Sequence, residues 1–185
     1  MNFNDHSRLV GTHAFLSASN YHWINYDLEK LSERFLTASA AKRGTELHVF
    51  ASEAIRLGIK LPKTSKTLNM YVNDAIGYRM TPEQVLFYSP NCFGTVDAIS
   101  FKRNLLRIHD LKTGVTKASM HQLEIYAAMF CLEYNFKPFN IDIVLRIYQE
   151  DEIVELHPER DEITHLMDKI ITFDKHLEKL RQEEP

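Results

Sequence analysis

The chain has 185 residues, of which 44% are hydrophobic and 25% are charged, and its formal net charge at pH 7 is −3. These values are typical of a globular protein with one core, and they exclude a generally basic protein that coats nucleic acid. No apolar run approaches the roughly 20 residues of a membrane span, and the first residues lack the apolar segment of a signal peptide. We therefore expect a cytoplasmic protein with no membrane partner.

Three helices are predicted in the N-terminal part of the chain. Ser17 or Ser19 can cap a helix that begins near Asn20 and runs toward Ala38. The second is predicted from Ala41 to Gly58, where glycine fits a C-terminal stop. Its apolar residues recur at helical spacing and are Leu47, Phe50, Ala51, Ala54 and Leu57. A loop at Leu61–Thr67 precedes a third helix, mostly exposed, at Lys66–Tyr78.

The rest of the chain alternates between strands and helices. Strands are predicted at about Gln84–Tyr88, Cys92–Phe101, Leu105–Leu111 and Ile141–Gln149, with Ile153–Leu156 as a candidate hairpin partner. Helices are predicted at about Ser119–Tyr134 and Glu159–Arg181. This order predicts an α/β fold with a central mixed β-sheet flanked by helices. We expect one domain, 1–185, with an N-terminal helical part (1–40), a core (41–157) and a C-terminal helix (158–185).

Two carboxylates on neighbouring strands form the most informative pattern in the sequence. Asp97 lies in Phe93-Gly-Thr-Val-Asp-Ala98, and Asp110 lies in His109-Asp-Leu-Lys-Thr-Gly114. Lys102, Arg103 and Asn104 separate the strands and indicate a hairpin, in which both aspartates are about equally far from the turn. Two buried like charges are costly unless a cation compensates them. A hard divalent metal and Lys112, on the same strand face as Asp110, would do so. The pattern favours metal-assisted phosphodiester cleavage, although ordinary strand-end carboxylates beside a surface lysine are the common alternative.

Two helical motifs add candidate residues. In Arg43-Gly-Thr-Glu-Leu-His48, the histidine flanks the apolar stripe of its helix, whereas Glu46 and Glu53 share the opposite flank. The spacing favours either His48 or the glutamates as ligands, and not easily both. Gln122 and Tyr126 are four residues apart and share one helix face, where they could support the lysine or orient a phosphate. The alternative in each case is a residue that serves packing or solvation.

In chain order, these residues resemble the RecB-type exonuclease branch of the PD-(D/E)XK nuclease superfamily. The four motifs are Gly44 to His48, Gly94 to Asp97, Asp110 to Lys112, and Gln122 to Tyr126, and the resemblance covers about residues 16–130. The opening Leu16-Ser-Ala-Ser-Asn-Tyr-His-Trp23 also looks like phage-borne nucleases of this branch. Some relatives carry an iron–sulfur cluster, but Trp23-Ile-Asn-Tyr-Asp27 contains no cysteine. The only cysteines, Cys92 and Cys131, are too few for a four-cysteine site within one chain.

The resemblance implies a restriction-endonuclease-like core that uses Mg²⁺ or Mn²⁺. It assigns metal contacts to His48, Asp97, Asp110 and the backbone carbonyl of Leu111. It makes Lys112 the catalytic lysine, supported by Gln122 and Tyr126, and leaves Glu53 as an outer residue. The implied function is a metal-dependent DNA nuclease, by resemblance an exonuclease, in phage or bacterial DNA recombination, repair and processing, inside a bacterial or phage-infected host cell.

DNA is the partner that the resemblance implies, with a helicase or recombination protein in trans, because the chain has no Gly-x-x-x-x-Gly-Lys-Ser/Thr motif. Ring-forming relatives make a homo-oligomer a further expectation. Candidate DNA contacts are basic (Lys42, Arg43, Lys60, Lys63, Lys66, Lys117) or aromatic (Tyr21, Trp23, Tyr26). Two other interpretations stay open: a non-catalytic DNA-binding module on the same fold, and a protein-interaction module with purely structural carboxylates. Only the nuclease requires a metal.

Overall fold

The computed structural model describes Arg8 and residues 14–183, and the chain divides into two compact units, residues 1–43 and 44–185. The boundary falls within the long helix α1 (Leu28–Leu57). In the first unit, the 3₁₀ helix η2 (Ala18–Asn25) precedes α1. The Trp23 indole Nε1 donates a hydrogen bond to the Ser17 carbonyl at 2.9 Å, and the rings of Phe15 and Phe35 pack edge to face. These contacts give the first unit a small aromatic centre of its own.

The prediction of two separate N-terminal helices is wrong. One helix of 30 residues begins at Leu28 rather than Asn20, and it continues through residues 38–41. Asp27 accepts a hydrogen bond from the Lys30 backbone N–H at 2.8 Å, so this aspartate caps α1 in place of Ser17 or Ser19. The segment 37–42 contains alanines and no proline, so nothing in the backbone interrupts the helix. The C-terminal end was predicted correctly, because Gly58 follows Leu57 with φ +67°.

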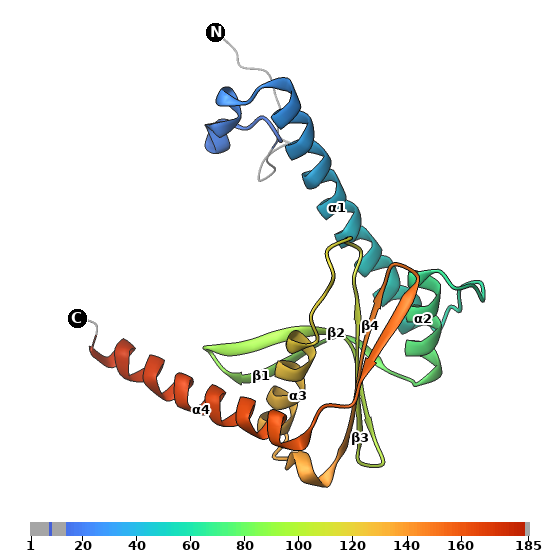
Figure 1. The fold of residues 1–185 in the computed structure, drawn as a ribbon, viewed down its shortest axis with the longest axis vertical. Coiled ribbons are helices and arrows are strands. Elements are labelled where there is room, and N and C mark those ends of the chain that lie inside the picture. The colour runs from blue at the N-terminus through green and yellow to red at the C-terminus, as the bar shows by residue number, and fades with distance from the viewer. Residues whose placement is uncertain (1–7, 9–13, 184–185) are drawn as a thin grey trace. The chain divides into compact units, whose positions relative to one another are not determined.

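The second unit is built on a five-stranded mixed sheet (Figure 1). Its strands are β1 (Thr81–Ser89), β2 (Cys92–Lys102), β3 (Leu105–Leu111), β4 (Asp142–Gln149) and β5 (Glu152–Leu156). They lie in the order β1-β2-β3-β4-β5, and only β3 and β4 are parallel. A parallel pair needs a crossover, which α3 (His121–Glu133) and the short 3₁₀ helix η3 (Pro138–Asn140) supply. The predicted α/β class with a mixed sheet flanked by helices is confirmed.

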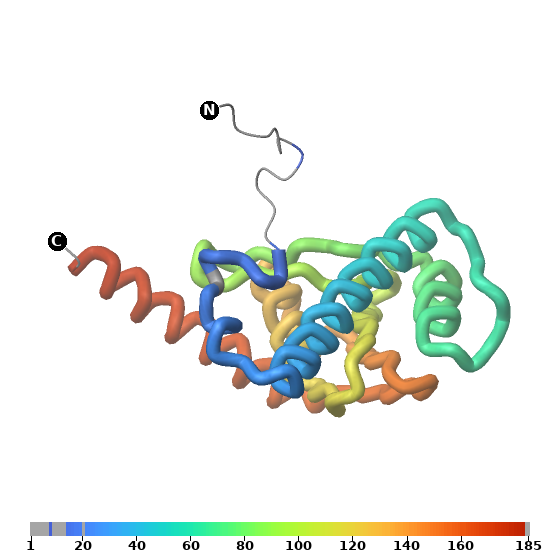
Figure 2. Tube along the Cα trace, turned by 90° about the horizontal axis from the view of Figure 1, so that it is seen from above, coloured from blue at the N-terminus to red at the C-terminus, as the bar shows by residue number. Residues whose placement is uncertain are grey.

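Helices cover the sheet from two sides and create two separate cores. α3 packs on the sheet, with α4 (Arg160–Glu183) behind it, around buried residues such as Leu106, Ile108 and Leu123. The C-terminal part of α1 and α2 (Thr67–Gly77) surround the second core, which includes Ala98, Leu111 and Tyr148. Figure 2 traces α4 past the sheet toward the C-terminal end of the described chain. The catalytic candidates on β2 and β3 therefore lie on strands held from both faces.

The expectation about the exposure of helix α2 is also wrong. It was predicted to be mostly exposed, but Tyr71, Val72 and Ala75 are buried in the core that it shares with α1. Six of its eleven residues are apolar, and those that are buried face the core that α2 shares with α1. Among the described helices, none combines the length and the apolar character needed to traverse a bilayer.

Candidate metal centre

The β2–β3 hairpin brings Asp97 and Asp110 together. Arg103 and Asn104 form its two-residue turn with φ of 52° and 59°, the backbone of a type I′ turn. Ala98 pairs with His109, so the same register one residue further places Asp97 opposite Asp110. The Leu111 backbone N–H donates to Asp97 Oδ2 at 2.8 Å and holds the aspartate side chain across the hairpin. The proximity that was inferred from equal distances to the turn is therefore present.

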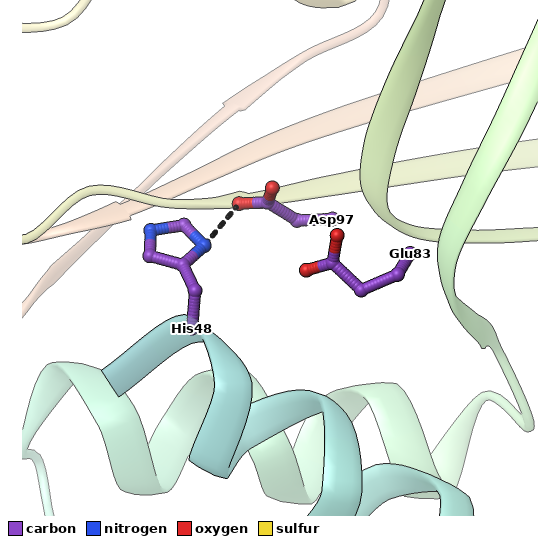
Figure 3. A group of neighbouring side chains, drawn as sticks. All are labelled: His48, Glu83 and Asp97. Carbon is purple, nitrogen blue, oxygen red and sulfur yellow. Dashed lines mark ion pairs between the residues drawn. The ribbon is translucent and has the colours of Figure 1, made fainter. Parts of the chain in front are cut away.

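A histidine and a second carboxylate complete a cluster around Asp97. His48 projects from α1, and its Nδ1 lies 3.4 Å from Asp97 Oδ2. Glu83 projects from β1, and one ligand atom from each of His48, Glu83 and Asp97 lies within 4.8 Å of the others. Figure 3 shows the imidazole of the helix facing the two carboxylates of the strands. Three different elements thus direct one nitrogen and two oxygen ligands toward a common point.

Glu83 is a site residue that the sequence did not reveal. Pro82 pairs with Ala98 and Gln84 with Val96, so Glu83 stands opposite Asp97 in the register. Its φ is +51°, a left-handed conformation in the interior of a strand, where residues other than glycine are rare. The predicted strand began at Gln84 and left this glutamate just outside it. No residue pattern in the sequence signals a left-handed glutamate, although its position next to the strand was a weak indication.

Asp110 and Lys112 form the other half of the centre. Asp110 is only 4% exposed, and the Lys112 ammonium lies 3.0 Å from Oδ2 and 3.2 Å from Oδ1. Lys112 also donates a hydrogen bond to Gln122 Oε1 on α3 at 2.9 Å. Within the described chain, the buried Oδ2 of Asp110 accepts no hydrogen bond. Gln122 thus supports the lysine, as its position on the helix had suggested.

Burial, and then the charge of Asp97, shift the pKa values of the carboxylates in this centre. Burial raises the pKa of Asp110, and repulsion from Asp97 raises it further, while Lys112 opposes the shift. Burial, followed by the charge of Asp97, raises the pKa of Glu83. The hydrogen bond to Asp97 is the main cause of the raised pKa of His48, which burial counteracts. A bound divalent cation would reverse each of these effects, because it stabilises carboxylates and competes with the imidazole proton.

The remaining candidate residues differ in their burial and in their contacts. The Tyr126 hydroxyl donates to the Thr95 carbonyl at 2.8 Å, and a Cβ built on Gly94 would lie 3.0 Å from its ring, so this tyrosine braces β2. Leu111 has a buried side chain at the end of β3. Glu46 and Glu53 on α1 are exposed, whereas His48 is half-buried and faces Asp97. Of the two alternatives left open for α1, the structure places the histidine at the site.

Two residues that were expected to contact DNA, Lys66 and Trp23, have partners within the protein. Lys66 pairs with Asp151 at 2.7 Å, so its charge is already partly compensated. The indole N–H of Trp23 is taken by the Ser17 carbonyl within the first unit. Lys60, Lys63 and Lys117 are exposed. The structure describes Lys42, Arg43, Tyr21 and Tyr26 in the first unit, and all but the half-buried Tyr26 are exposed.

The donor set of the centre fits a hard divalent cation. Carboxylate oxygens with one imidazole are typical ligands of Mg²⁺ or Mn²⁺, and the absence of thiolates from the cluster disfavours a structural zinc site. The buried Asp110 carboxylate lies next to this donor set and is paired with one ammonium, that of Lys112, so its Oδ2 would gain from a further positive charge. A scan against protein-family models and searches of curated proteins and of solved structures gave no match to the chain.

Proposed function

We propose that the protein is a metal-dependent deoxyribonuclease with a restriction-endonuclease-like core. The observation that carries this proposal is the convergence of His48, Glu83 and Asp97 beside the Asp110–Lys112 pair. The four motifs of the resemblance lie on the elements expected for them, which are α1, β2, β3 and α3. This agreement supports a nuclease of the RecB type, with exonucleolytic cleavage as the expected mode.

His48, Asp97 and Asp110 would hold Mg²⁺ or Mn²⁺, with the Leu111 carbonyl and with Glu83 as an additional carboxylate. When bound, the cation supplies charge that polarises a phosphoryl oxygen and lowers the pKa of a bound water. Lys112 stabilises negative charge as it develops on the phosphate, because its ammonium is fixed between Asp110 and Gln122. His48 must be neutral to act as a ligand, so acid opposes the reaction.

The two binding-module alternatives explain the centre less well. A module that only binds DNA has no use for a lysine held by a buried carboxylate, since a buried Asp110 repels phosphate unless it is neutralised. A protein-interaction module requires no cluster of one imidazole and several carboxylates. Neither alternative requires a metal at this centre.

The test is a cleavage assay with end-labelled linear DNA and closed circular DNA, in Mn²⁺, Mg²⁺ or EDTA. We expect metal-dependent loss of the linear substrate, abolished in Asp110→Asn, and sparing of closed circles if the cleavage is exonucleolytic. Asp161→Asn is the matched control, because this aspartate is exposed at the start of α4. Equal activity of the wild type and Asp110→Asn would refute the proposed centre.

A further inference from the structure

A basic hollow lies at the end of the β2–β3 hairpin that is opposite to the candidate metal centre. It has a volume of about 600 Å³ and is bordered by the end of α2, the hairpin turn and the start of β4. Its charged residues are Arg79, Lys102, Arg103, Arg107 and Asp142. Four cations against one carboxylate are unusual for a chain whose net charge is −3.

The positive charge of this hollow is not neutralised by neighbouring carboxylates. In the part of the chain that the structure describes, none of the four cations forms an ion pair. Asp142 is instead paired with Arg160 at 3.2 Å. The Arg107 guanidinium lies over the Tyr78 ring, 4.3 Å from its centroid, which holds it in place without cancelling its charge. The hollow therefore presents a fixed site of positive potential.

The backbone holds two of these cations in unfavourable conformations. Arg79 and Arg103 both have φ of 52°, a region that favours glycine or asparagine. The hairpin turn is anchored as well, because the Asp142 backbone N–H donates to the Asn104 carbonyl at 2.8 Å. Arginine at these two positions adds positive charge at a cost in backbone energy, which a role in binding an anion would explain.

The two strands that border the hollow also carry the catalytic candidates. Arg103 is six residues from Asp97 along β2, which corresponds to roughly 20 Å at about 3.3 Å per residue. A nucleic-acid strand of several nucleotides spans a distance of this size. Guanidinium groups match the oxygens of a phosphate in two-point hydrogen bonds. A strand with its scissile phosphate at the metal centre would be long enough to reach the hollow.

We infer that the hollow is a phosphate-binding site for a nucleic-acid strand, roughly 20 Å from the bond that is cleaved. The placement of the scissile bond rests on the proposed nuclease function, whereas the binding of phosphate does not. The site adds affinity and sets a minimal length for efficient substrates. An acidic polypeptide is the competing occupant, because its carboxylates offer similar charge without the regular spacing of a phosphate backbone.

The first experiment measures binding in EDTA, where no metal centre is formed. The triple variant Arg79→Gln/Lys102→Gln/Arg103→Gln is titrated against a labelled single strand of about 20 nucleotides at several salt concentrations. Since each phosphate contact contributes about 0.7 to the slope of log affinity against log salt, we expect that slope to become shallower by about two. At low salt, the affinity should fall at least tenfold. The matched control is Lys137→Gln/Lys169→Gln/Lys175→Gln, which removes three exposed lysines elsewhere and should change little.

The second experiment measures cleavage in Mn²⁺ of a short strand, a dinucleotide, and of a long strand of about 20 nucleotides. The hollow variant should slow cleavage of the long strand and leave that of the short strand unchanged, because the short strand cannot reach it. The hollow variant could bind DNA more weakly while the wild type neither binds Mn²⁺ nor cleaves DNA. That outcome would support the phosphate site and refute the nuclease function. Unchanged affinity and salt slope would overturn the inference even if the wild type is an active nuclease. Loss of affinity for polyglutamate with retained affinity for DNA would overturn it in favour of an acidic peptide.

Discussion

Glu83 shows the strongest conflict between the preference of one residue and its place in the molecule. A left-handed glutamate inside a strand costs about 1–2 kcal/mol, and here its carboxylate also faces Asp97. Strain of this kind persists where the surrounding structure imposes it, and it is concentrated at functional sites. We therefore propose that Glu83 occupies this position because it would share a bound cation with His48 and Asp97.

Replacing Glu83 should separate stability from metal binding. In Glu83→Gly, we expect the free energy of unfolding without metal to rise by about 1 kcal/mol, because glycine accepts the left-handed backbone. The same variant should lose most of the stabilisation that Mn²⁺ gives the wild type. Urea unfolding with and without Mn²⁺ measures both effects. Glu150→Gly is the matched control, since Glu150 has φ of 50° in an exposed turn and its loss should leave the Mn²⁺ effect intact. A full Mn²⁺ effect in Glu83→Gly would exclude Glu83 as a ligand.

Lys112 should affect catalysis without controlling the metal. Lys112→Ala removes the charge that stabilises the transition state, so we expect cleavage to fall by about 100-fold or more. Mn²⁺ binding should persist or become tighter, because the removed ammonium competes with the cation for Asp110. Single-turnover cleavage and Mn²⁺ titration, run beside Lys169→Ala, which replaces an exposed lysine on α4, check the two effects separately. Unchanged cleavage by Lys112→Ala would show that the lysine is only structural.

His109 gives the folded state a pH dependence that is independent of the metal centre. The side chain is fully buried, and burial lowers its pKa to about 3, with Arg146 and Arg107 acting in the same direction. The Tyr148 hydroxyl donates to Asp74 at 2.7 Å and lies 3.2 Å from His109 Nδ1, so its oxygen accepts from Nδ1–H. This assignment leaves Nε2 as a buried acceptor without a partner in the described chain.

The sign of the His109 effect follows from which state binds the proton. The unfolded histidine titrates near 6.5 and the folded one near 3, so below about pH 6.5 the unfolded state binds more protons and stability falls with acid. The contribution approaches about 1.4 kcal/mol per pH unit between about pH 6 and 4. Urea unfolding across this range should show a shallower dependence in His109→Asn, while His165→Asn, which replaces an exposed histidine, should follow the wild type. Parallel curves for His109→Asn and the wild type would contradict the depressed pKa.

At the scale of elements, α3 packs on β2 where Tyr126 lies against Gly94. A Cβ on Gly94 would lie 3.0 Å from Tyr126 Cε1 and 3.2 Å from its hydroxyl, so the phenol must move away. We expect Gly94→Ala to lower the free energy of unfolding by about 1 kcal/mol or more and to break the bond from Tyr126 to the Thr95 carbonyl. Chemical denaturation compares the free energy of unfolding of Gly94→Ala with that of Gly77→Ala, because a Cβ at Gly77 would have no atom within 4 Å. Equal stability of the two variants would show that Tyr126 does not brace β2.

The strands could be predicted well because their local sequence is sufficient to indicate where each strand begins and ends. Runs rich in Val, Ile, Leu and Phe between turn residues predicted β2, β3 and β4 to within one or two residues of their ends. The hairpin then fixed the approach of Asp97 to Asp110, whereas the contact of Gln122 with Lys112 was expected from the family resemblance. The centre was therefore largely predictable wherever it depends on local geometry.

The errors arose where tertiary structure decides the outcome. The break predicted at 38–41 is an error of another kind, because three alanines and one serine favour a continuous helix and helix ends are hard to place from sequence. The burial of α2 depends on its contacts with α1 and with Tyr148 on β4. Glu83 was missed because its left-handed backbone opposes its own propensity, and only the register with β2 places it beside Asp97. Propensity and periodicity contain no information on such positions.

At the scale of the whole molecule, charge is distributed along one hairpin. The β2–β3 pair carries buried and half-buried carboxylates at one end, and at the other end cations that form no ion pair among the described residues. A metal at the first end would turn it from a region that repels phosphate into one that attracts it. We therefore expect DNA affinity to rise when Mn²⁺ is added to a cleavage-deficient Lys112→Ala protein. Anisotropy titrations with and without EDTA check this, and equal affinity in both would contradict a coupled site.

Calorimetric titration of Mn²⁺ into the purified protein tests most directly whether the cluster of His48, Glu83 and Asp97 holds a cation. We predict saturable binding that Asp97→Asn abolishes and that Asp161→Asn, with its exposed carboxylate, leaves unchanged. No saturable binding to the wild type, or equal binding to wild type and Asp97→Asn, would contradict the metal centre and favour a protein-interaction module with structural carboxylates.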